Sequence, residues 1–464
     1  MTARLTLAMS GAHHSELEAH LFPGDGREAA AILLCTRVGA PAHRLMVKAV
    51  HLVPHAECQR EGDELVWPGE HIEDCLTIAE AEDLSLVLAH SHPGGYANFS
   101  NSDDNSDLEL MPSMFLARPD GREGPMVHGS AIMIPGGWMR ARVYSDSLER
   151  TDIDLVSVTG DDLWHFRPGE PDRQAPLAFS EAMTACLGGF HAGLVGVSGT
   201  GSVVAEQLLR LGVGQLTVID DDVIEHKNLN RILNSTRLDA DNKAVKVRVF
   251  ERTAAAVRPE ARVTAIQRTF GAREPIEAMA RVDVLFCCVD THGGRDLCDR
   301  LATALLLPLF DVGVVIPVRQ TADGSTVIQD VQGRIDYIQP GASSLLTRGV
   351  YTAAGVAAEE LRRKDPDAFA RQVDEGYMPG LADEAPSVIT VNMRAASMVV
   401  QEFIARTFPY RLDGNRPFAR TMFALAIEET DYFPEDDFPL ASKTRYAAGF
   451  ATPLLGIPSL ETAR

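Results

Sequence analysis

The segment 191–212, HAGLVGVSGTGSVVAEQLLRLG, constrains the fold more than any other part of the chain. An apolar run of strand length enters a glycine-rich turn, and a helical pattern follows that Gly212 ends. Gly196, Gly199 and Gly201 lie in the turn. Glycines between a strand and a helix N-terminus let the backbone approach a phosphate group. The segment therefore predicts a βα unit with a candidate nucleotide site.

The rest of the second half repeats this alternation. Strand patterns occupy 215–221, 263–267 and 282–290, and a helical pattern occupies 243–257. Strands that alternate with helices predict a parallel, doubly wound, Rossmann-like sheet. A long helix is expected near 388–407.

The first half predicts a smaller α/β unit. Apolar strands are expected at Ala29–Cys35, Leu45–Leu52 and Leu84–Ala89, and a helix at His71–Asp83. Prolines, charges and few periodic apolar residues between 151 and 172 are typical of a linker. We therefore expect an α/β chain divided into a domain at 1–150, a linker at 151–172, a second domain at 173–410 and a C-terminal extension of unknown role at 411–464.

Composition narrows the class of partner. A chain of 464 residues exceeds one ordinary core, which agrees with two or three domains. The net charge of −22 disfavours nucleic acid, because binding a polyanion needs a positive surface. The sequence contains no run of about 18 apolar residues, so no membrane span is expected. The seven scattered cysteines are typical of reduced thiols, so we expect a cytoplasmic protein.

The string HSHPGGYANFSNSD at 90–103 carries the first candidate site. His90 and His92 are two residues apart, so in an extended segment their side chains point the same way. Asp103 follows a loop that can fold back. Two imidazoles and a carboxylate are a usual ligand set for catalytic zinc, and a carboxylate such as Glu28 could serve as its base. An isolated HxH is otherwise more often a polar strand end.

The whole string resembles the JAMM (MPN+) metalloprotease motif, in which HxHP is followed by six residues, Ser, two residues and Asp. The resemblance implies Zn²⁺ on His90, His92 and Asp103, oxyanion support from Ser100, and Glu28 as general acid and base. Glu28 is assigned to the acid–base role by its position alone, and Glu16 and Glu18 are the weaker alternatives. Two further acidic residues of the loop, Asp104 and Asp107, are expected to be solvated charges.

The first features of the second candidate site fit both a nucleotide-activating enzyme and a dehydrogenase. Asp220 lies 19 residues after Gly201, and an acidic residue at about that spacing also suits a dehydrogenase. The later residues favour the nucleotide-activating enzyme, because their order resembles that of the ThiF/MoeB/ubiquitin-activating family. The matching positions are Asp220, Asn228, Arg231, Lys243 and Asp290.

The resemblance implies ATP and Mg²⁺ as cofactors. Arg173, Arg231 and Lys243 would neutralise phosphate charge, with Lys243 beginning a helix. Asp290 would hold magnesium and Asp220 the ribose hydroxyls. Arg173 resembles the arginine that reaches a neighbouring subunit in this family, which implies a homodimer.

Some features depart from the family. PGASSLLTRG at 340–349 has serines where a zinc-binding CxxC could lie, and no cysteine follows Cys298. Cys287, Cys288 and Cys298 are expected to be core residues, so adenylation without an enzyme thioester is the expected reaction.

The combined expectation is a zinc isopeptidase fused to an enzyme that adenylates the C-terminal glycine of a ubiquitin-like protein. The implied partners are that protein and a conjugating enzyme, or a sulfur-carrier protein and a sulfurtransferase. Activation of a sulfur carrier for cofactor or amino-acid sulfuration is one alternative. A nucleotide-sensing scaffold with inactive sites is the other.

Overall fold

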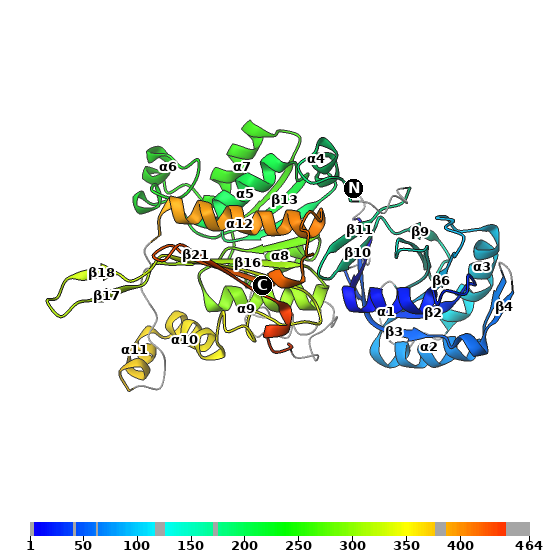
Figure 1. Cartoon of the computed structure of the whole chain (residues 1–464). Coiled ribbons are helices and arrows are strands. Elements are labelled where there is room, and N and C mark those ends of the chain that lie inside the picture. Colours follow the sequence, from blue (N-terminus) through cyan, green and yellow to red (C-terminus); the bar gives the residue numbers. More distant parts are fainter. Residues whose placement is uncertain are drawn as a thin grey trace. The chain divides into compact units, whose positions relative to one another are not determined.

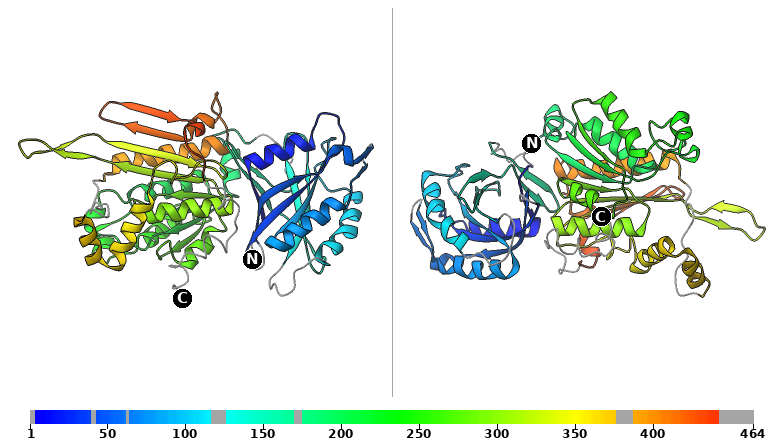
Figure 2. Two further views of the ribbon diagram at one scale, coloured as in Figure 1. Left: turned by 90° about the horizontal axis from the view of Figure 1, so that it is seen from below. Right: turned by 180° about the vertical axis from the view of Figure 1, so that it is seen from behind.

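The computed structural model describes residues 4–39, 43–61, 64–116, 126–169, 175–375 and 387–441. These residues form two compact units, one mainly within the first 175 residues and the other mainly within 176–442 (Figures 1 and 2). Each unit has its own sheet and its own helices, and the two are described separately.

The first unit is built on a mixed sheet. Over the described residues its nine strands run in the order β11-β10-β1-β3-β2-β6-β7-β8-β9. Their bounds are β1 (Thr6–Ser10), β2 (Ala30–Val38), β3 (Arg44–Leu52), β6 (Ser85–Ser91), β7 (Val127–Met133), β8 (Met139–Ser145), β9 (Arg150–Asp152), β10 (Leu155–Thr159) and β11 (Leu163–Phe166). A separate hairpin joins β4 (Gln59–Glu61) to β5 (Glu64–Val66), after a 3-10 turn at His55–Glu57.

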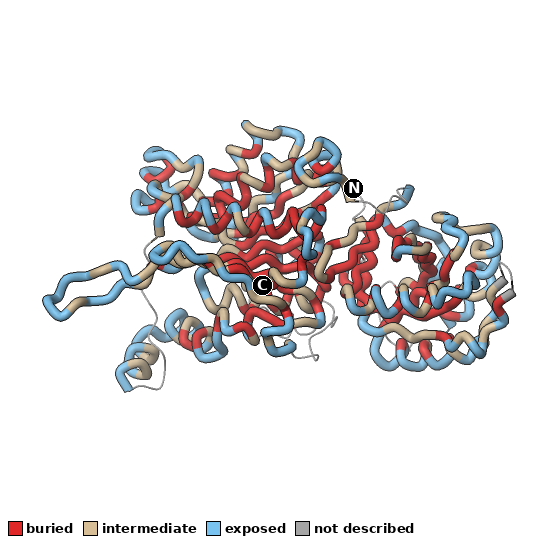
Figure 3. The backbone as a smooth tube through the Cα atoms, in the orientation of Figure 1, coloured by how far each residue is buried: buried red, intermediate tan, exposed pale blue. Residues whose placement is uncertain are grey.

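Helices cover both faces of this sheet. Helix α1 (Gly11–Leu21) buries Leu17 and Leu21 in one apolar cluster. Helices α2 (Glu70–Glu82) and α3 (Asn101–Leu116) contribute to a second cluster on other strand residues, with Ile72 from α2 and Met111 from α3. Because strand side chains alternate between faces, the two clusters are the two sides of one layered core (Figure 3).

The expected linker at 151–172 is corrected by the structure. Strand β10 pairs in parallel with β1, with Leu155 opposite Thr6, and β11 pairs with β10. All five residues of β10 are buried. The run LVSVT is a buried strand whose pattern the neighbouring charges and prolines obscured, so the segment up to Phe166 completes the first sheet.

The second unit has the predicted doubly wound sheet. Over the described residues its eight strands run β14-β13-β12-β15-β16-β19-β20-β21, and the first five are parallel. Their bounds are β12 (His191–Val195), β13 (Gln215–Ile219), β14 (Arg262–Ile266), β15 (Val284–Cys287), β16 (Leu309–Val315), β19 (Gln332–Ile338), β20 (Arg420–Ala424) and β21 (Glu429–Phe433). The exposed hairpin of β17 (Val318–Gln320) and β18 (Thr326–Ile328) projects from this unit (Figures 1 and 3).

The second unit contains helices on and around its sheet (Figure 1). They are α4 (Glu181–Leu187), α5 (Gly199–Leu211), α6 (Arg237–Asp241), α7 (Lys246–Val257), α8 (Arg273–Met279), α9 (His292–Leu305), α10 (Ala353–Lys364), α11 (Pro366–Asp374) and α12 (Ile389–Thr407), with 3-10 turns at His226–Asn228, Arg416–Phe418 and Glu435–Asp437. Helix α5 ends as predicted at Gly212, whose φ of 111° is left-handed. Among the described helices, none combines the length and the apolar character needed to cross a membrane.

The expectation of a separate extension after residue 410 is corrected for the described residues up to 441. Strand β20 pairs with β19, and β21 pairs with β20, so this part of the chain finishes the second sheet. The alternation of buried and half-buried residues in Arg420–Ala424 is that of a half-covered strand.

Candidate functional site

The two histidines and the aspartate of the first site lie together. His90 is in β6, His92 follows the end of that strand, and Asp103 is in the first turn of α3. The Nε2 atoms of the histidines are 3.0 Å apart, and the Asp103 carboxylate oxygens lie 3.1 Å from His90 Nε2 and 3.5 Å from His92 Nε2. Three ligand atoms within 4.8 Å of one another can hold one metal ion.

A backbone carbonyl determines which nitrogen of His92 faces this cluster. His92 Nδ1 lies 2.8 Å from the carbonyl oxygen of Tyr96. Because a carbonyl only accepts, Nδ1 carries the hydrogen and Nε2 of the neutral ring is left with its lone pair towards His90 and Asp103. Burial lowers the pKa of His92, but hydrogen bonds to Asp103 and Tyr96 outweigh it and raise that pKa overall.

Ser100 and Asp103 cap the start of α3 reciprocally. The Asp103 N–H donates to Ser100 Oγ at 3.1 Å, and the Ser100 N–H donates to an Asp103 carboxylate oxygen at 2.6 Å. This is the geometry of a capping box. The cap holds the Asp103 carboxylate beside the histidines.

Glu28 lies in the loop just before β2, the strand that pairs with the histidine strand β6. Ala30 of β2 is opposite His90, and Ala29 and Ser91 exchange hydrogen bonds, so Glu28 comes opposite His92. The Glu28 charge acts to raise the pKa of His92. The charges of the two alternative residues act elsewhere: that of Glu18 raises the pKa of His14, and that of Glu16 raises the pKa of His13, both against the effect of burial.

Arg60 holds the loop that carries Glu28, a role that no sequence pattern indicates. Its Nε donates to the Glu28 carbonyl at 2.5 Å, and its other nitrogens donate to Asp25 and to the Arg27 carbonyl. One buried guanidinium therefore fixes the backbone of 25–28.

The prediction that Asp107 is a solvated charge is wrong. Asp107 is 5% exposed, and its Oδ2 accepts hydrogen bonds from Ser130, Arg142 and Tyr144. Arg142 also binds the half-exposed Asp104. A carboxylate buried with a guanidinium and two hydroxyls ties α3 to the sheet, which positions Asp103 one turn earlier.

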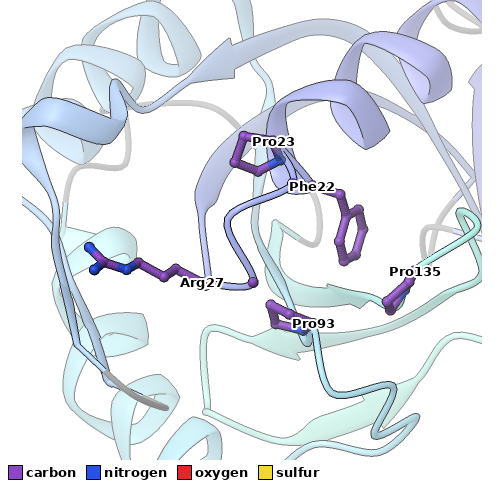
Figure 4. A pocket seen from close by; sticks show the side chains of 7 residues that line it. Phe22, Pro23, Arg27, Pro93 and Pro135 are labelled. Atoms are coloured by element: carbon purple, nitrogen blue, oxygen red, sulfur yellow. The ribbon is translucent and has the colours of Figure 1, made fainter.

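An apolar hollow of about 250 Å³ lies beside this site. It is lined by Phe22, Pro23, Gly24, Gly26, Arg27, Pro93 and Pro135. Figure 4 shows the phenylalanine and the prolines around the hollow, with the Arg27 side chain directed away. Two lining residues, Arg27 and Pro93, are the neighbours of Glu28 and His92 in sequence.

The glycine turn of the second site lies after β12. Gly196 has a left-handed φ of 89°, and a Cβ at Gly201 would lie 1.8 Å from the Gly196 carbonyl oxygen. Both positions therefore require glycine. Asp220, directly after β13, accepts a hydrogen bond from the Val197 N–H at 2.7 Å. The turn and Asp220 lie at the carboxyl ends of adjacent parallel strands, where such sheets bind ligands.

The prediction that Lys243 begins the next helix is wrong. Lys243 is exposed in a loop with a φ of 48°, and α7 begins at Lys246. The buried Lys246 ammonium lies 2.7 Å from Asp222 Oδ2 and 3.7 Å from Asp220 Oδ1. Burial raises the pKa of Asp220, and the charge of Lys246 opposes that shift. Lys246, rather than Lys243, is the cation beside Asp220.

The remaining predicted residues are distributed around the turn. Gly199 leaves room for Arg231 and for Asn392 of α12, since an added Cβ would lie 3.2 Å from Arg231 Cδ and 2.3 Å from Asn392 Nδ2. Asn228 is buried and its Oδ1 accepts the Glu225 N–H at 2.9 Å, so this side chain holds a turn. Asp290 is exposed after β15, at the same sheet edge as Gly196. Sequence reasoning missed Asn392.

Arg173 lies outside the described residues, so its position is not tested. The cysteines near Asp290 agree with the expectation of core residues, because Cys287 and Cys298 are fully buried. Burial raises the pKa of the Cys287 and Cys288 thiols well above their usual value. Such thiols are poor nucleophiles at neutral pH.

Two family models match the chain. The model described as "ThiF family" matches residues 172–440, and that described as "Prokaryotic homologs of the JAB domain" matches residues 10–141. The fold and the matches define an α/β protein in which a JAB domain is fused to an adenylyltransferase-like domain. The chain belongs to the ThiF family, which implies ATP use.

Curated proteins resemble part of the chain. The Escherichia coli (strain K12) sulfur carrier protein ThiS adenylyltransferase is 30% identical over 122 residues, or 26% of this chain and 48% of the relative. The Arabidopsis thaliana ubiquitin-like modifier-activating enzyme 5 is 26% identical over 208 residues, or 41% of this chain and 45% of the relative. The chain thus spans about half the length of these relatives.

A solved structure of E. coli MccB with ATP aligns with 55% of this chain and 66% of its own, at 16% identity and a TM-score of 0.40.

Proposed function

We propose that the chain is a zinc-dependent isopeptidase joined to an ATP-dependent adenylating enzyme, both acting on the C-terminus of a ubiquitin-like protein. The observation that carries this proposal is the cluster of His90, His92 and Asp103 with Glu28 beside it, in a chain of the ThiF family. An isopeptidase would release the C-terminal glycine that an adenylating domain consumes.

The donor set of the first site fits zinc. It offers two imidazole nitrogens and one carboxylate, and the Tyr96 carbonyl fixes the tautomer of His92. Zinc bound there would supply a hydroxide-like water and polarise the scissile carbonyl. Glu28 would take the proton of the attacking water and deliver it to the leaving amine, while Ser100 would support the oxyanion. The apolar hollow would take a substrate side chain next to the scissile bond.

The test is hydrolysis of a ubiquitin-like protein that carries a C-terminal extension. We expect Glu28→Gln to retain zinc and to lose about 10²–10⁴-fold in rate, because a positioned base contributes that much. Glu16→Gln is the matched control and should leave the rate unchanged. Full activity in Glu28→Gln, or in chelated wild type, would refute this half of the proposal.

In the second unit, the turn at Gly196, Gly199 and Gly201 would receive the ATP phosphates, and Asp220 would bind the ribose. Arg231 and Lys246 would neutralise the charge that develops when a terminal carboxylate attacks the α-phosphate. Asp290 would anchor Mg²⁺. Arg173 would act on the ATP of a partner copy in a homodimer, and an obligate monomer with full activity would exclude that role.

The second half is tested by ATP–pyrophosphate exchange that depends on a ubiquitin-like protein ending in glycine. Asp290→Ala should abolish exchange, because the magnesium would lose its protein ligand. An exchange rate unchanged by this substitution would refute the assignment.

Sulfur-carrier activation is the second candidate, favoured by the similarity to the ThiS adenylyltransferase and by the raised pKa values of Cys287 and Cys288. A non-reducing gel after incubation with ATP and partner distinguishes the outcomes. A dithiothreitol-sensitive conjugate would indicate an enzyme thioester and ubiquitin-like conjugation. Its absence, with exchange intact, would favour adenylation for sulfur transfer.

A further inference from the structure

A second pair of histidines in the first unit lies outside the site described above. His51 is near the end of β3 and His71 is in the first turn of α2. His51 Nε2 and His71 Nδ1 are 2.9 Å apart, so the two rings present nitrogens to each other. These residues come from different elements, 20 positions apart in sequence.

The outer nitrogen of His71 determines its tautomer. His71 Nε2 lies 3.0 Å from a carboxylate oxygen of Glu57. An ionised carboxylate only accepts hydrogen bonds, so Nε2 carries a hydrogen. In the neutral ring, Nδ1 then keeps its lone pair, directed at His51. A carboxylate on the outer nitrogen of an imidazole is the usual arrangement around a metal-bound histidine.

The pair shares two features with His90 and His92, which differ from it in having Asp103 as a third nearby ligand. In both pairs the facing nitrogens are close, at 2.9 Å and 3.0 Å. In both, an acceptor outside the pair holds the opposite nitrogen of one ring: the carboxylate of Glu57 here and the carbonyl of Tyr96 there. A tetrahedral zinc with Zn–N bonds of about 2.0–2.1 Å needs only a small separation of such nitrogens.

The surroundings favour a cation. Metal binding needs the neutral imidazole, and its lone pair here would lie between the two facing rings. Asp74 lies three residues after His71 in α2, and its charge also acts on His51. Glu70 and Glu73 add negative charge in the same turn.

We propose that His51 and His71 form a second site for a divalent transition metal such as zinc. His51 Nε2 and His71 Nδ1 are its protein ligands, water completes the coordination, and Glu57 positions His71. The metal joins β3 to the start of α2. These elements bracket the connection that carries Arg60, whose guanidinium holds the Glu28 loop. The site is independent of the proposed catalytic zinc.

The test measures the zinc content of the full chain after exposure to ZnCl2 and dialysis. A His90→Ala/His92→Ala variant removes the first site, and we expect it to retain about one zinc per chain. Adding His51→Ala and His71→Ala should remove that zinc. The matched control is His226→Ala, a solvent-exposed histidine that pairs with Asp241 in the second unit and should change nothing.

A second measurement guards against misfolding of the quadruple variant. In the His90→Ala/His92→Ala background, Glu57→Gln should weaken zinc binding about 10–100-fold, as loss of an outer carboxylate does. Cobalt substitution should give a visible d–d spectrum that His71→Ala abolishes. A zinc-free His90→Ala/His92→Ala chain would overturn the proposal. Zinc binding that is unaffected by the His51 and His71 substitutions would also overturn it.

Discussion

Lys243 and Lys246 are three residues apart, yet the fold gives them different surroundings. Lys243 is exposed with left-handed backbone, whereas Lys246 is buried at the start of α7 beside Asp220 and Asp222. If the glycine turn binds phosphate as proposed, a buried ammonium at this sheet edge would attract it strongly, because few waters screen its charge. Surroundings, rather than residue type, separate the two lysines.

We therefore predict that Lys246→Ala lowers the rate of ATP–pyrophosphate exchange about 10²–10³-fold, as loss of one preorganised donor does. Lys243→Ala should change it less than about threefold, since an exposed side chain contributes little. Steady-state exchange with saturating partner protein gives the comparison, and circular dichroism checks folding. Equal losses in both variants would contradict this assignment.

The two lysines also show which features of the site could not be predicted from the sequence. The proximity of His90, His92 and Asp103 in the first unit, and the glycine turn between a strand and a helix in the second, follow from local motifs whose spacing determines their geometry. The choice of Lys243 failed because the position at which α7 begins depends on a left-handed turn that residue spacing does not reveal. Arg60 and Asn392 were missed because their contacts join segments far apart in sequence.

At the scale of elements, an ion-pair network centred on Arg348 holds the loop at 340–349. Arg348 is fully buried and binds Asp336 of β19 at 3.0 Å and Glu435 at 2.6 Å. Its Nε also donates to Ser343 Oγ, and Nη1 donates to the Ala419 carbonyl. One side chain thus ties the loop to β19, to the residue before β20 and to the last described turn.

We predict that Arg348→Ala lowers the unfolding free energy of the second unit by about 3–5 kcal/mol, because it leaves buried carboxylates without their partner. Arg416→Ala is the control. Its pair with Asp436 is exposed, so the loss should be below about 1 kcal/mol. Urea denaturation followed by a probe in the second unit measures both. A small effect of Arg348→Ala would show that Arg334 and Arg420 suffice to hold Asp336.

At the scale of the whole molecule, each unit has its own sheet and contains all the described residues of its candidate site. Substitutions that share no contacts usually have additive effects. We therefore predict that the His90→Ala/His92→Ala chain loses hydrolysis but exchanges pyrophosphate within about twofold of wild type. Lys246→Ala should lose pyrophosphate exchange but keep its hydrolysis rate within about twofold of wild type.

Hydrolysis and pyrophosphate exchange are measured in parallel on the same preparations. One ubiquitin-like protein is the substrate, with and without a C-terminal extension. The extended form also tests the order of the reactions. Wild type should exchange pyrophosphate with it only after cleavage, because adenylation needs the free carboxylate of the C-terminal glycine, and in the extended form that carboxyl group is part of a peptide bond. The His90→Ala/His92→Ala chain should exchange with the processed form alone. If this variant exchanged equally well with both forms, hydrolysis would not be what exposes the glycine, and the fusion would need another explanation.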